Sequence, residues 1–221
     1  MAITSFRLGA ALRFFLQSPT HVKYQMLSVL AARIKGAVYY RRVFAEFGER
    51  SVLFKPTLIS NPQYMHIGKN VWIRSGARLG AETADPDHLP EIWIEDNVAI
   101  EQDVQIGAVG KIRIGKNTAI GARCAIIGGF HPFVDVHSQT PIKNRLSGSR
   151  SVTEVGEGSL IGVGTVIKMN VKIGKHVVVG PNSVVAANLP DYCLAEGNPA
   201  AVVMKYNPTT DRWERPQSTG K

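Results

Sequence analysis

The segment IIGGFHPFVDVHSQTPI, residues 126–142, gathers the side chains of this chain that are best suited to acid–base chemistry. It holds His131 beside Pro132, followed by Asp135 and His137. A neutral imidazole can take a proton from a hydroxyl near pH 7, because its ordinary pKa lies close to that value. His131 is therefore a candidate general base, although a histidine packed at the mouth of a loop is the alternative. His137 is more simply explained as a solvated loop residue.

The elements on both sides of this segment share a six-residue rhythm. An Ile, Val or Leu recurs at every sixth position in runs that begin at Ile67, Ile94, Ile114 and Val155. A lone helix repeats near 3.6 residues and a flat strand at 2, so neither accounts for the period. A short strand plus a corner, repeated and stacked, does account for it. A sandwich of short strands would show variable spacings of about 8–12 residues instead.

The residues between the apolar positions also fit a stacked coil. A small or β-branched residue often follows the apolar residue by four places, where it would point inward too. Gly and Asn occupy the corners, as in Lys69-Asn70 and Lys116-Asn117, and both types tolerate a positive φ. Fifteen units predict five coils of three faces each. The expected fold class is an all-β solenoid, a parallel β-helix of hexapeptide repeats.

Three interruptions break the rhythm, at residues 80–91, 106–114 and 127–154. The last is the largest, yet the repeat resumes in register at Val155. A structural defect would disturb the register, so we interpret 127–154 as an inserted functional loop that is extruded from the solenoid.

The chain divides into three expected parts. Residues 1–50 form a basic amphipathic helical segment, residues 51–204 form the β-helix domain, and residues 205–221 form a polar C-terminal tail. The stretch TTDRWERPQSTGK, residues 209–221, has a composition common in mobile chain ends, and we expect it to be mobile.

The N-terminal segment carries most of the basic charge. Residues 4–47 show apolar residues at helical spacing, and Pro19 divides them into two helices because it lacks an amide hydrogen. Eight of the 26 Lys and Arg residues lie in 1–50 against two Glu, which is +6 of the net +9. Such a helix can cap another domain or pack in an oligomer, and it can lie on an anionic membrane surface. The sequence leaves both roles open.

The sequence also indicates a compartment. No segment reaches the ~18 consecutive apolar residues of a membrane span, and Arg13 interrupts an N-terminal apolar run that has no cleavage pattern. Cys124 and Cys193 are far apart and are expected to be small buried residues in a reducing compartment. We expect a cytoplasmic protein, with the inner membrane surface as the open alternative.

Three local motifs resemble those of the hexapeptide-repeat acyltransferases, over roughly residues 67–204. They are His131-Pro132 at the mouth of the long loop, VGEGSLIGVGTVIKMNVKIGKHVVVGPNSVV from Val155, and LAEGNPAAVV from Leu194. The similarity is greatest to sugar and polysaccharide O-acetyltransferases. It implies a left-handed parallel β-helix, although parallel crossovers are normally right-handed. It also implies acetyl-CoA as the acyl donor, and a homotrimer with active sites between subunits.

The resemblance assigns roles to particular residues. His131 matches the general base, which follows the last coil residue by five positions. Glu101, Asp103 and Asp135 are candidates to orient His131 by accepting a hydrogen bond from its other ring nitrogen. The resemblance implies polar substrate-binding residues near Glu101 and Asp103, and Asp135 could also bind substrate. Solvent-facing carboxylates are the alternative for each.

The resemblance also indicates where coenzyme A would lie. The Val163 amide matches a position near the thioester, and Pro181 matches the next coil but has no amide hydrogen. Ala187 and Ala201 replace lysines that are common in the family, so the phosphates would need other cations. Lys168, Lys172, Lys175 and Lys205 could serve, with Lys168 and Lys205 as the preferred candidates, although solvated surface lysines are the simpler interpretation.

The expected function is therefore acetyl-CoA-dependent O-acetyl transfer to a sugar hydroxyl in surface polysaccharide biosynthesis, such as exopolysaccharide or O-antigen. Two alternatives stay open: an N-acyltransferase acting on an amino sugar, and a catalytically silent β-helix that binds or assembles. A zinc-dependent carbonic anhydrase of the same fold needs three converging histidines, and the sequence offers no clearly placed pair beside His131. We expect no metal and no nucleic-acid partner.

Overall fold

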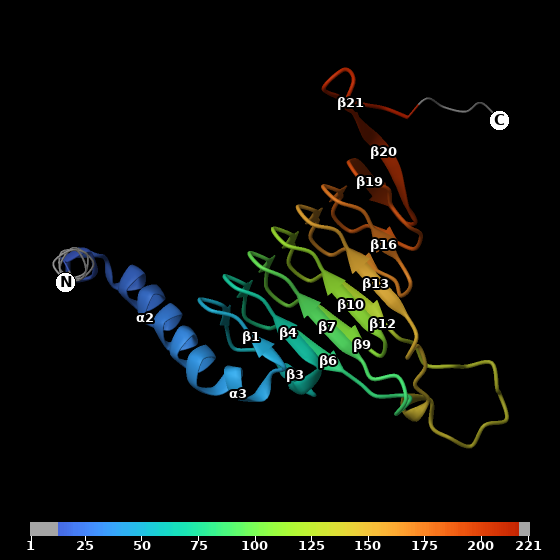
Figure 1. Cartoon of the computed structure of the whole chain (residues 1–221), viewed down its shortest axis with the longest axis horizontal. Coiled ribbons are helices and arrows are strands. Elements are labelled where there is room, and N and C mark those ends of the chain that lie inside the picture. Colours follow the sequence, from blue (N-terminus) through green and yellow to red (C-terminus); the bar gives the residue numbers. More distant parts are fainter. Residues whose placement is uncertain (1–12, 217–221) are drawn as a thin grey trace.

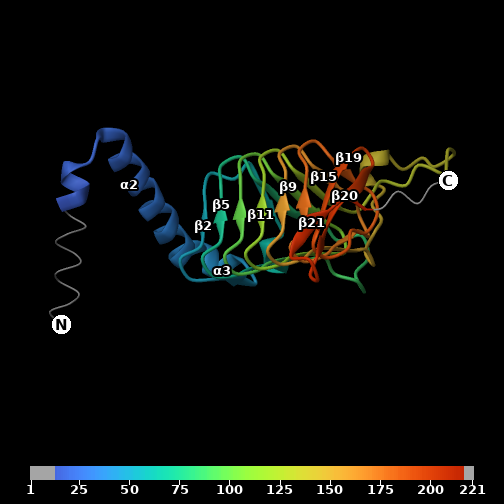
Figure 2. The same ribbon diagram turned by 90° about the horizontal axis from the view of Figure 1, so that it is seen from above.

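The computed structural model describes residues 13–216 and shows a three-sided prism of stacked coils (Figures 1 and 2). Each coil contributes one strand to each of three sheets, and the strands of successive coils run parallel. Sheet A contains β1 (Glu46–Phe47), β4 (Met65–Ile67), β7 (Glu91–Ile94), β10 (Lys111–Ile114), β13 (Val152–Val155) and β16 (Lys172–Ile173). Sheet B contains β2 (Val52–Leu53), β5 (Trp72–Ile73), β8 (Ala99–Ile100), β11 (Ala119–Ile120), β14 (Leu160–Ile161) and β17 (Val178–Val179). Sheet C contains β3 (Leu58–Ser60), β6 (Arg78–Ala81), β9 (Gln105–Ala108), β12 (Ala125–Gly128), β15 (Val166–Ile167) and β18 (Val184–Val185).

The period-six residues form the core, as predicted. Successive coils pair in register, so that Ile94 lies beside Ile114 and Ile114 beside Val155. These side chains are buried inside the prism, and each stabilises the fold by roughly 1.5–3 kcal/mol. The small residues four places later are buried as well, including Val98, Thr118 and Thr165. The solenoid and its inward-facing pattern are therefore confirmed.

The prism has six coils rather than the five predicted, because the first coil was not recognised in the sequence. Phe47, Leu53 and Ile59 already keep the six-residue step and pair with the second coil. A Phe in the pattern and a longer step through the 3-10 helix η2 (Pro62–Tyr64) hid this coil. The helix predicted up to residue 47 was therefore too long, because residues 46 and 47 are strand β1.

The helical segment breaks at Ser18-Pro19, as predicted. Residues 13–17 are helical, and α2 (Thr20–Lys35) follows, continued by a π-helical turn η1 (Gly36–Tyr40) and by α3 (Arg41–Val43). The predicted start at residue 4 lies outside the described residues. The end of this segment is anchored most firmly, where the buried rings of Tyr40, Phe44 and Phe47 pack together with centroids 5.2–5.5 Å apart.

The C-terminal region is more ordered than expected. β19 (Cys193–Gly197) pairs with β17, and β20 (Ala200–Asn207) and β21 (Arg212–Glu214) add to it antiparallel. Residues 212–214, which lie in the stretch expected to be mobile, thus form a paired strand. Both cysteines are free and buried, and burial raises the pKa of the Cys124 and Cys193 thiols.

Candidate active site

The three corners of the prism differ in length. Each corner between sheets A and B (the A–B corner) has four residues, and so does each corner between sheets B and C (the B–C corner). The corners from sheet C back to sheet A (the C–A corner) vary: residues 82–90, 109–110 and 129–151 connect successive coils there. All three interruptions seen in the sequence therefore lie along one edge of the prism.

The long loop at this edge, residues 129–151, leaves the prism as an extended arm (Figure 1, yellow). Its base is closed by Phe130 and Ser147, whose backbone amides each donate to the other's carbonyl at 3.0 Å. The buried Ser151 hydroxyl donates to the Gly128 carbonyl at 2.7 Å, where the chain rejoins sheet A. The loop can therefore vary in conformation without disturbing the register of the coils.

His131 is the first residue beyond this closure. Its Nδ1 lies 2.7 Å from the backbone carbonyl oxygen of Arg145. A carbonyl only accepts hydrogen bonds, so Nδ1 carries the hydrogen and Nε2 carries the free lone pair. The loop therefore fixes the tautomer that a general base needs.

Arg145 also organises the far part of the loop. Its guanidinium donates to the carbonyls of Thr140 at 2.7 Å, Ser138 at 2.9 Å and Asp135 at 3.1 Å. Arg145 was not predicted from the sequence, because nothing in its spacing marks an arginine that forms hydrogen bonds only with backbone carbonyls. The group that accepts the hydrogen bond from His131 is the backbone carbonyl of Arg145. A carboxylate of Asp135, Glu101 or Asp103 was expected in this role.

A groove of about 390 Å³ runs from His131 across the outer face of sheet C. Phe130 and Leu146 line it from the loop, and Arg78 and Gln105 from the strands. The same groove contains Glu82, the first residue of the 82–90 insertion, whose carboxylate is exposed. This acceptor of hydrogen bonds was not predicted, and its place at the start of a polar insertion was the one available signal.

Two glycines form the floor of this groove. A Cβ on Gly107 would meet no atom within 4 Å, and a Cβ on Gly80 would meet only the Glu82 carboxylate at 3.6 Å. Neither has a positive φ. A strand glycine that neither packing nor backbone conformation requires marks a place where a ligand or another chain approaches closely.

Glu101 and Asp103 lie at the B–C corner. The Glu101 carboxylate pairs with Arg74 at 3.0 Å. Asp103 has a φ of 59°, and its amide donates to the Ser75 carbonyl at 3.1 Å. Within one chain, therefore, both carboxylates have local roles at the corner.

Val163 and Pro181 lie at the same B–C corner on neighbouring coils, since Ile161 pairs with Val179. Val163 is exposed, and its amide donates to no acceptor among residues 13–216. Its carbonyl accepts from the Asn182 amide at 2.8 Å. A free amide at this corner can serve as a hydrogen-bond donor to a ligand.

The two expected lysines are on different parts of the surface. Lys168 is exposed at the C–A corner, one coil beyond the loop, and Lys205 is exposed on β20. Within the described part of the chain neither forms an ion pair, whereas Lys172 pairs with Glu154 at 3.2 Å. The structure therefore leaves Lys168 and Lys205 free for an anion but does not bring them together.

A larger cleft, of about 730 Å³, lies beside the 82–90 insertion and the end of the loop. The histidine and the lysine that line it are already paired: His88 lies 2.9 Å from Asp85, and Lys111 lies 3.0 Å from Glu91. The Asp87 amide, with His88, lowers the pKa of Asp85, and the indole of Trp93, with Lys111, lowers the pKa of Glu91. No set of three His, Cys, Asp or Glu side chains suited to a metal occurs within residues 13–216. The His131 groove is thus the better candidate site.

Comparison with known proteins agrees with this fold. No protein-family model matches the chain. A protein of Escherichia coli (strain K12), provisionally named lipopolysaccharide biosynthesis O-acetyl transferase WbbJ, is 28% identical over 164 residues, which cover 72% of this chain and 81% of that protein.

Solved structures of AntD, an N-acyltransferase from Bacillus cereus, share the architecture. A variant in complex with dTDP and coenzyme A has a TM-score of 0.61 at 19% identity, covering 77% of this chain and 89% of AntD. Another, in complex with dTDP-4-amino-4,6-dideoxyglucose and coenzyme A, has a TM-score of 0.61 at 20% identity, covering 77% and 88%. These structures confirm the left-handed parallel β-helix, and the similarity to WbbJ supports the resemblance to the hexapeptide-repeat acyltransferases that the sequence motifs indicated.

Proposed function

We propose that this chain is an acetyl-CoA-dependent O-acetyltransferase that acts on a sugar hydroxyl in surface polysaccharide biosynthesis. The observation that carries the proposal is the fixed tautomer of His131 at the mouth of an open groove. A sugar hydroxyl is a weak nucleophile at neutral pH, so a positioned base is the main catalytic group that the reaction needs.

In the proposed mechanism, Nε2 of His131 accepts the hydroxyl proton as the sugar oxygen attacks the thioester carbon. The imidazolium that forms keeps its Nδ1–H bond to the Arg145 carbonyl, which stabilises the positive charge. The tetrahedral intermediate then collapses, the carbon–sulfur bond breaks, and Nε2 returns the proton to the departing thiolate. The products are the acetyl ester and coenzyme A.

We further propose a homotrimer with sites shared between subunits. His131 and Lys168 are at the C–A edge, whereas Glu101, Asp103 and Val163 are at the B–C edge, on the other side of sheet C. When two prisms pack side by side, the C–A edge of one can face the B–C edge of the next. The Val163 amide could then stabilise the oxyanion of the intermediate. Pro181 on the next coil has no amide hydrogen, so it could contact the ligand but could not donate a hydrogen bond to it.

The proposal also covers the acceptor molecule and the compartment in which the reaction takes place. Glu82 and the glycine floor leave room for a hydroxyl-rich ligand beside His131, and WbbJ, as named, acts in lipopolysaccharide biosynthesis. We assign the reaction to the cytoplasm, where acetyl-CoA is available. N-acylation is the second candidate, because AntD is an N-acyltransferase crystallised with an amino sugar nucleotide.

The test is to mix the purified full chain with acetyl-CoA and a panel of hydroxyl and amino sugars, free and nucleotide-linked, and to follow free thiol. Acceptor-dependent thiol release is expected, with a product that alkaline hydroxylamine cleaves as an ester. A hydroxylamine-resistant product would establish the N-acyl alternative. No thiol release above the enzyme-free rate with any acceptor would favour a silent scaffold.

A further inference from the structure

Helix α2 faces the prism with its small and polar residues. Ala32 is the residue of α2 that is buried. Gln25, Ser28 and Val29 line a shallow cleft together with Trp72 of β5, so this side of the helix is turned toward the prism. In both views α2 projects from the end of the prism at an angle (Figures 1 and 2).

Five large apolar residues of α2 and of the turn η1 that continues it point away from the prism. Tyr24, Leu27, Leu30, Ile34 and Val38, which we call the outer stripe, are 53–66% exposed. Spacings of three and four residues place them on one side of the helix. No other described element covers them. A helix that packed only against its own domain would show the opposite arrangement, with its large apolar side chains turned inward.

The charge around the outer stripe is uniformly positive. Residues 1–45 contain seven Lys and Arg and no Asp or Glu. Arg33, Lys35, Arg41 and Arg42 are exposed along the same helical segment. If two copies of this chain paired through the outer stripe, these cations would face one another with no carboxylate on either helix to neutralise them. An anionic surface neutralises them and buries the apolar side chains at the same time.

We propose that the outer stripe of α2 binds the surface of an anionic lipid bilayer, with the helix lying in the plane of the headgroups. Its 16 residues extend about 24 Å, less than the ~30 Å hydrocarbon core. None of the described helices meets the length and hydropathy needed to cross a membrane. The proposal concerns where the prism is held and does not depend on the acyl-transfer reaction.

The test uses the full chain and co-sedimentation with vesicles of phosphatidylcholine, with and without phosphatidylglycerol. Wild type should sediment with the anionic vesicles, and the bound fraction should fall as salt is raised. Equal sedimentation with both vesicle types, or none with either at low salt, would overturn the proposal. If light scattering also showed that the stripe mediates self-association, the second copy would be its partner instead.

Three variants separate the contributions. Leu27→Ser with Ile34→Ser should weaken binding at least about tenfold, because both residues leave apolar side chains in the interface. Arg33→Gln with Lys35→Gln should weaken it by about fivefold for each cation. Leu58→Ser, an exposed leucine on β3, is the matched control and should bind like wild type. A stripe variant that binds like Leu58→Ser, with all melting temperatures unchanged, would contradict the proposal.

Discussion

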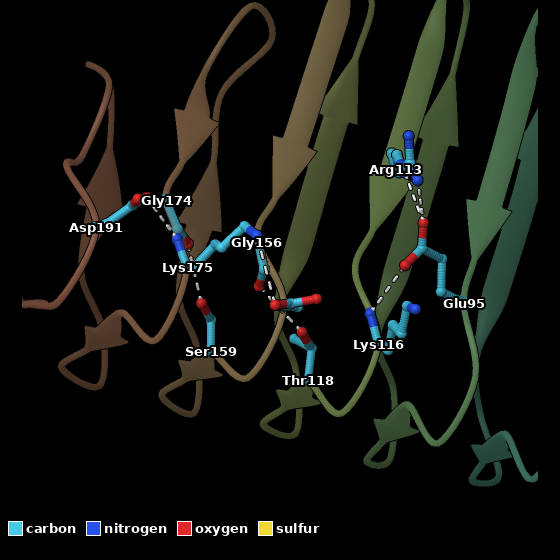
Figure 3. Close-up of polar contacts among 10 residues, drawn as sticks. Glu95, Arg113, Lys116, Thr118, Gly156, Ser159, Gly174, Lys175 and Asp191 are labelled. Atoms are coloured by element: carbon cyan, nitrogen blue, oxygen red, sulfur yellow. Dashed lines mark hydrogen bonds and ion pairs between the residues drawn. The ribbon is translucent and has the colours of Figure 1, made fainter.

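The A–B corner and the C–A corner of the prism are built from the same repeat, but they have different properties. At the A–B corner each turn has four residues and is tied to the next coil (Figure 3). The Thr118 hydroxyl donates to the Gly156 carbonyl at 3.2 Å, and the Ser159 hydroxyl donates to the Gly174 carbonyl at 3.1 Å. At the C–A corner the turns vary in length and carry His131, Glu82 and the groove.

The difference shows how one fold can combine rigidity with variation. A–B turns are in contact with turns above and below, so an insertion would separate the coils. Segments at the C–A corner leave the prism outward, and the coils on either side still pair, as Ile114 does with Val155 across the 129–151 loop. Function can therefore vary at this edge while the stack remains intact.

The largest predicted effect on stability is at the A–B corner, from Gly156→Ala. A Cβ there would lie 2.3 Å from the Gly174 carbonyl oxygen and 2.4 Å from its carbon. These are backbone atoms, so the coils themselves must shift, and the free energy of unfolding should fall by about 2–3 kcal/mol. Denaturant unfolding of the full chain measures this. Gly107→Ala is the matched control, since its Cβ meets nothing within 4 Å, and equal losses for both would refute the contrast between the regions.

A smaller effect is expected within the C–A loop, from Arg145→Gln. The variant removes the guanidinium contacts to the carbonyls of Thr140, Ser138 and Asp135, so the loop holds His131 less firmly. We expect kcat to fall about 30-fold, because small misplacements of a catalytic group reduce rate steeply. Steady-state kinetics and melting temperature should be measured together.

Arg150→Gln is the control for this variant. Arg150 is exposed at the other end of the same loop, and its side chain makes no hydrogen bond to the described residues. It should retain near wild-type kcat. If Arg145→Gln behaved like this control, the arginine would not organise the site.

The smallest effect concerns the groove floor. Gly107→Val places a side chain in open space without strain in the fold. If the acceptor lies over this floor, its KM should rise about tenfold while kcat changes little, as expected for lost binding that is common to ground and transition states. An unchanged KM with altered oligomeric mass would indicate that a second subunit, not the acceptor, occupies the space.

The sequence predicted the parts of this molecule that repeat. Every sixth residue packs on its counterpart in the next coil, so the core and the solenoid could be predicted from spacing. His131 stood out because it interrupts that spacing. The first coil did not, because Phe47 and the longer step through η2 weaken the periodic signal.

The features that the sequence did not predict are of two kinds. Some are side chains that contact only backbone atoms, and others are positions that have no neighbouring atoms. Arg145 acts through carbonyl groups, which every residue has, so its position carries no recognisable pattern. Gly107 is distinguished by the atoms it lacks, and other strand glycines, such as Gly128, are required by packing. The paired strands after residue 205 were missed because their side chains are largely polar and exposed.

The most direct test of the central claim, that the rigid prism presents its chemistry at the C–A edge, is the acetyl-transfer rate of His131→Ala measured beside its thermal unfolding. The matched control is His137→Ala, six residues along the same loop. The account predicts a fall in kcat of about 10²–10⁴-fold for His131→Ala alone, with both variants melting like wild type. An unchanged rate for His131→Ala, or an equal loss in His137→Ala, would contradict it.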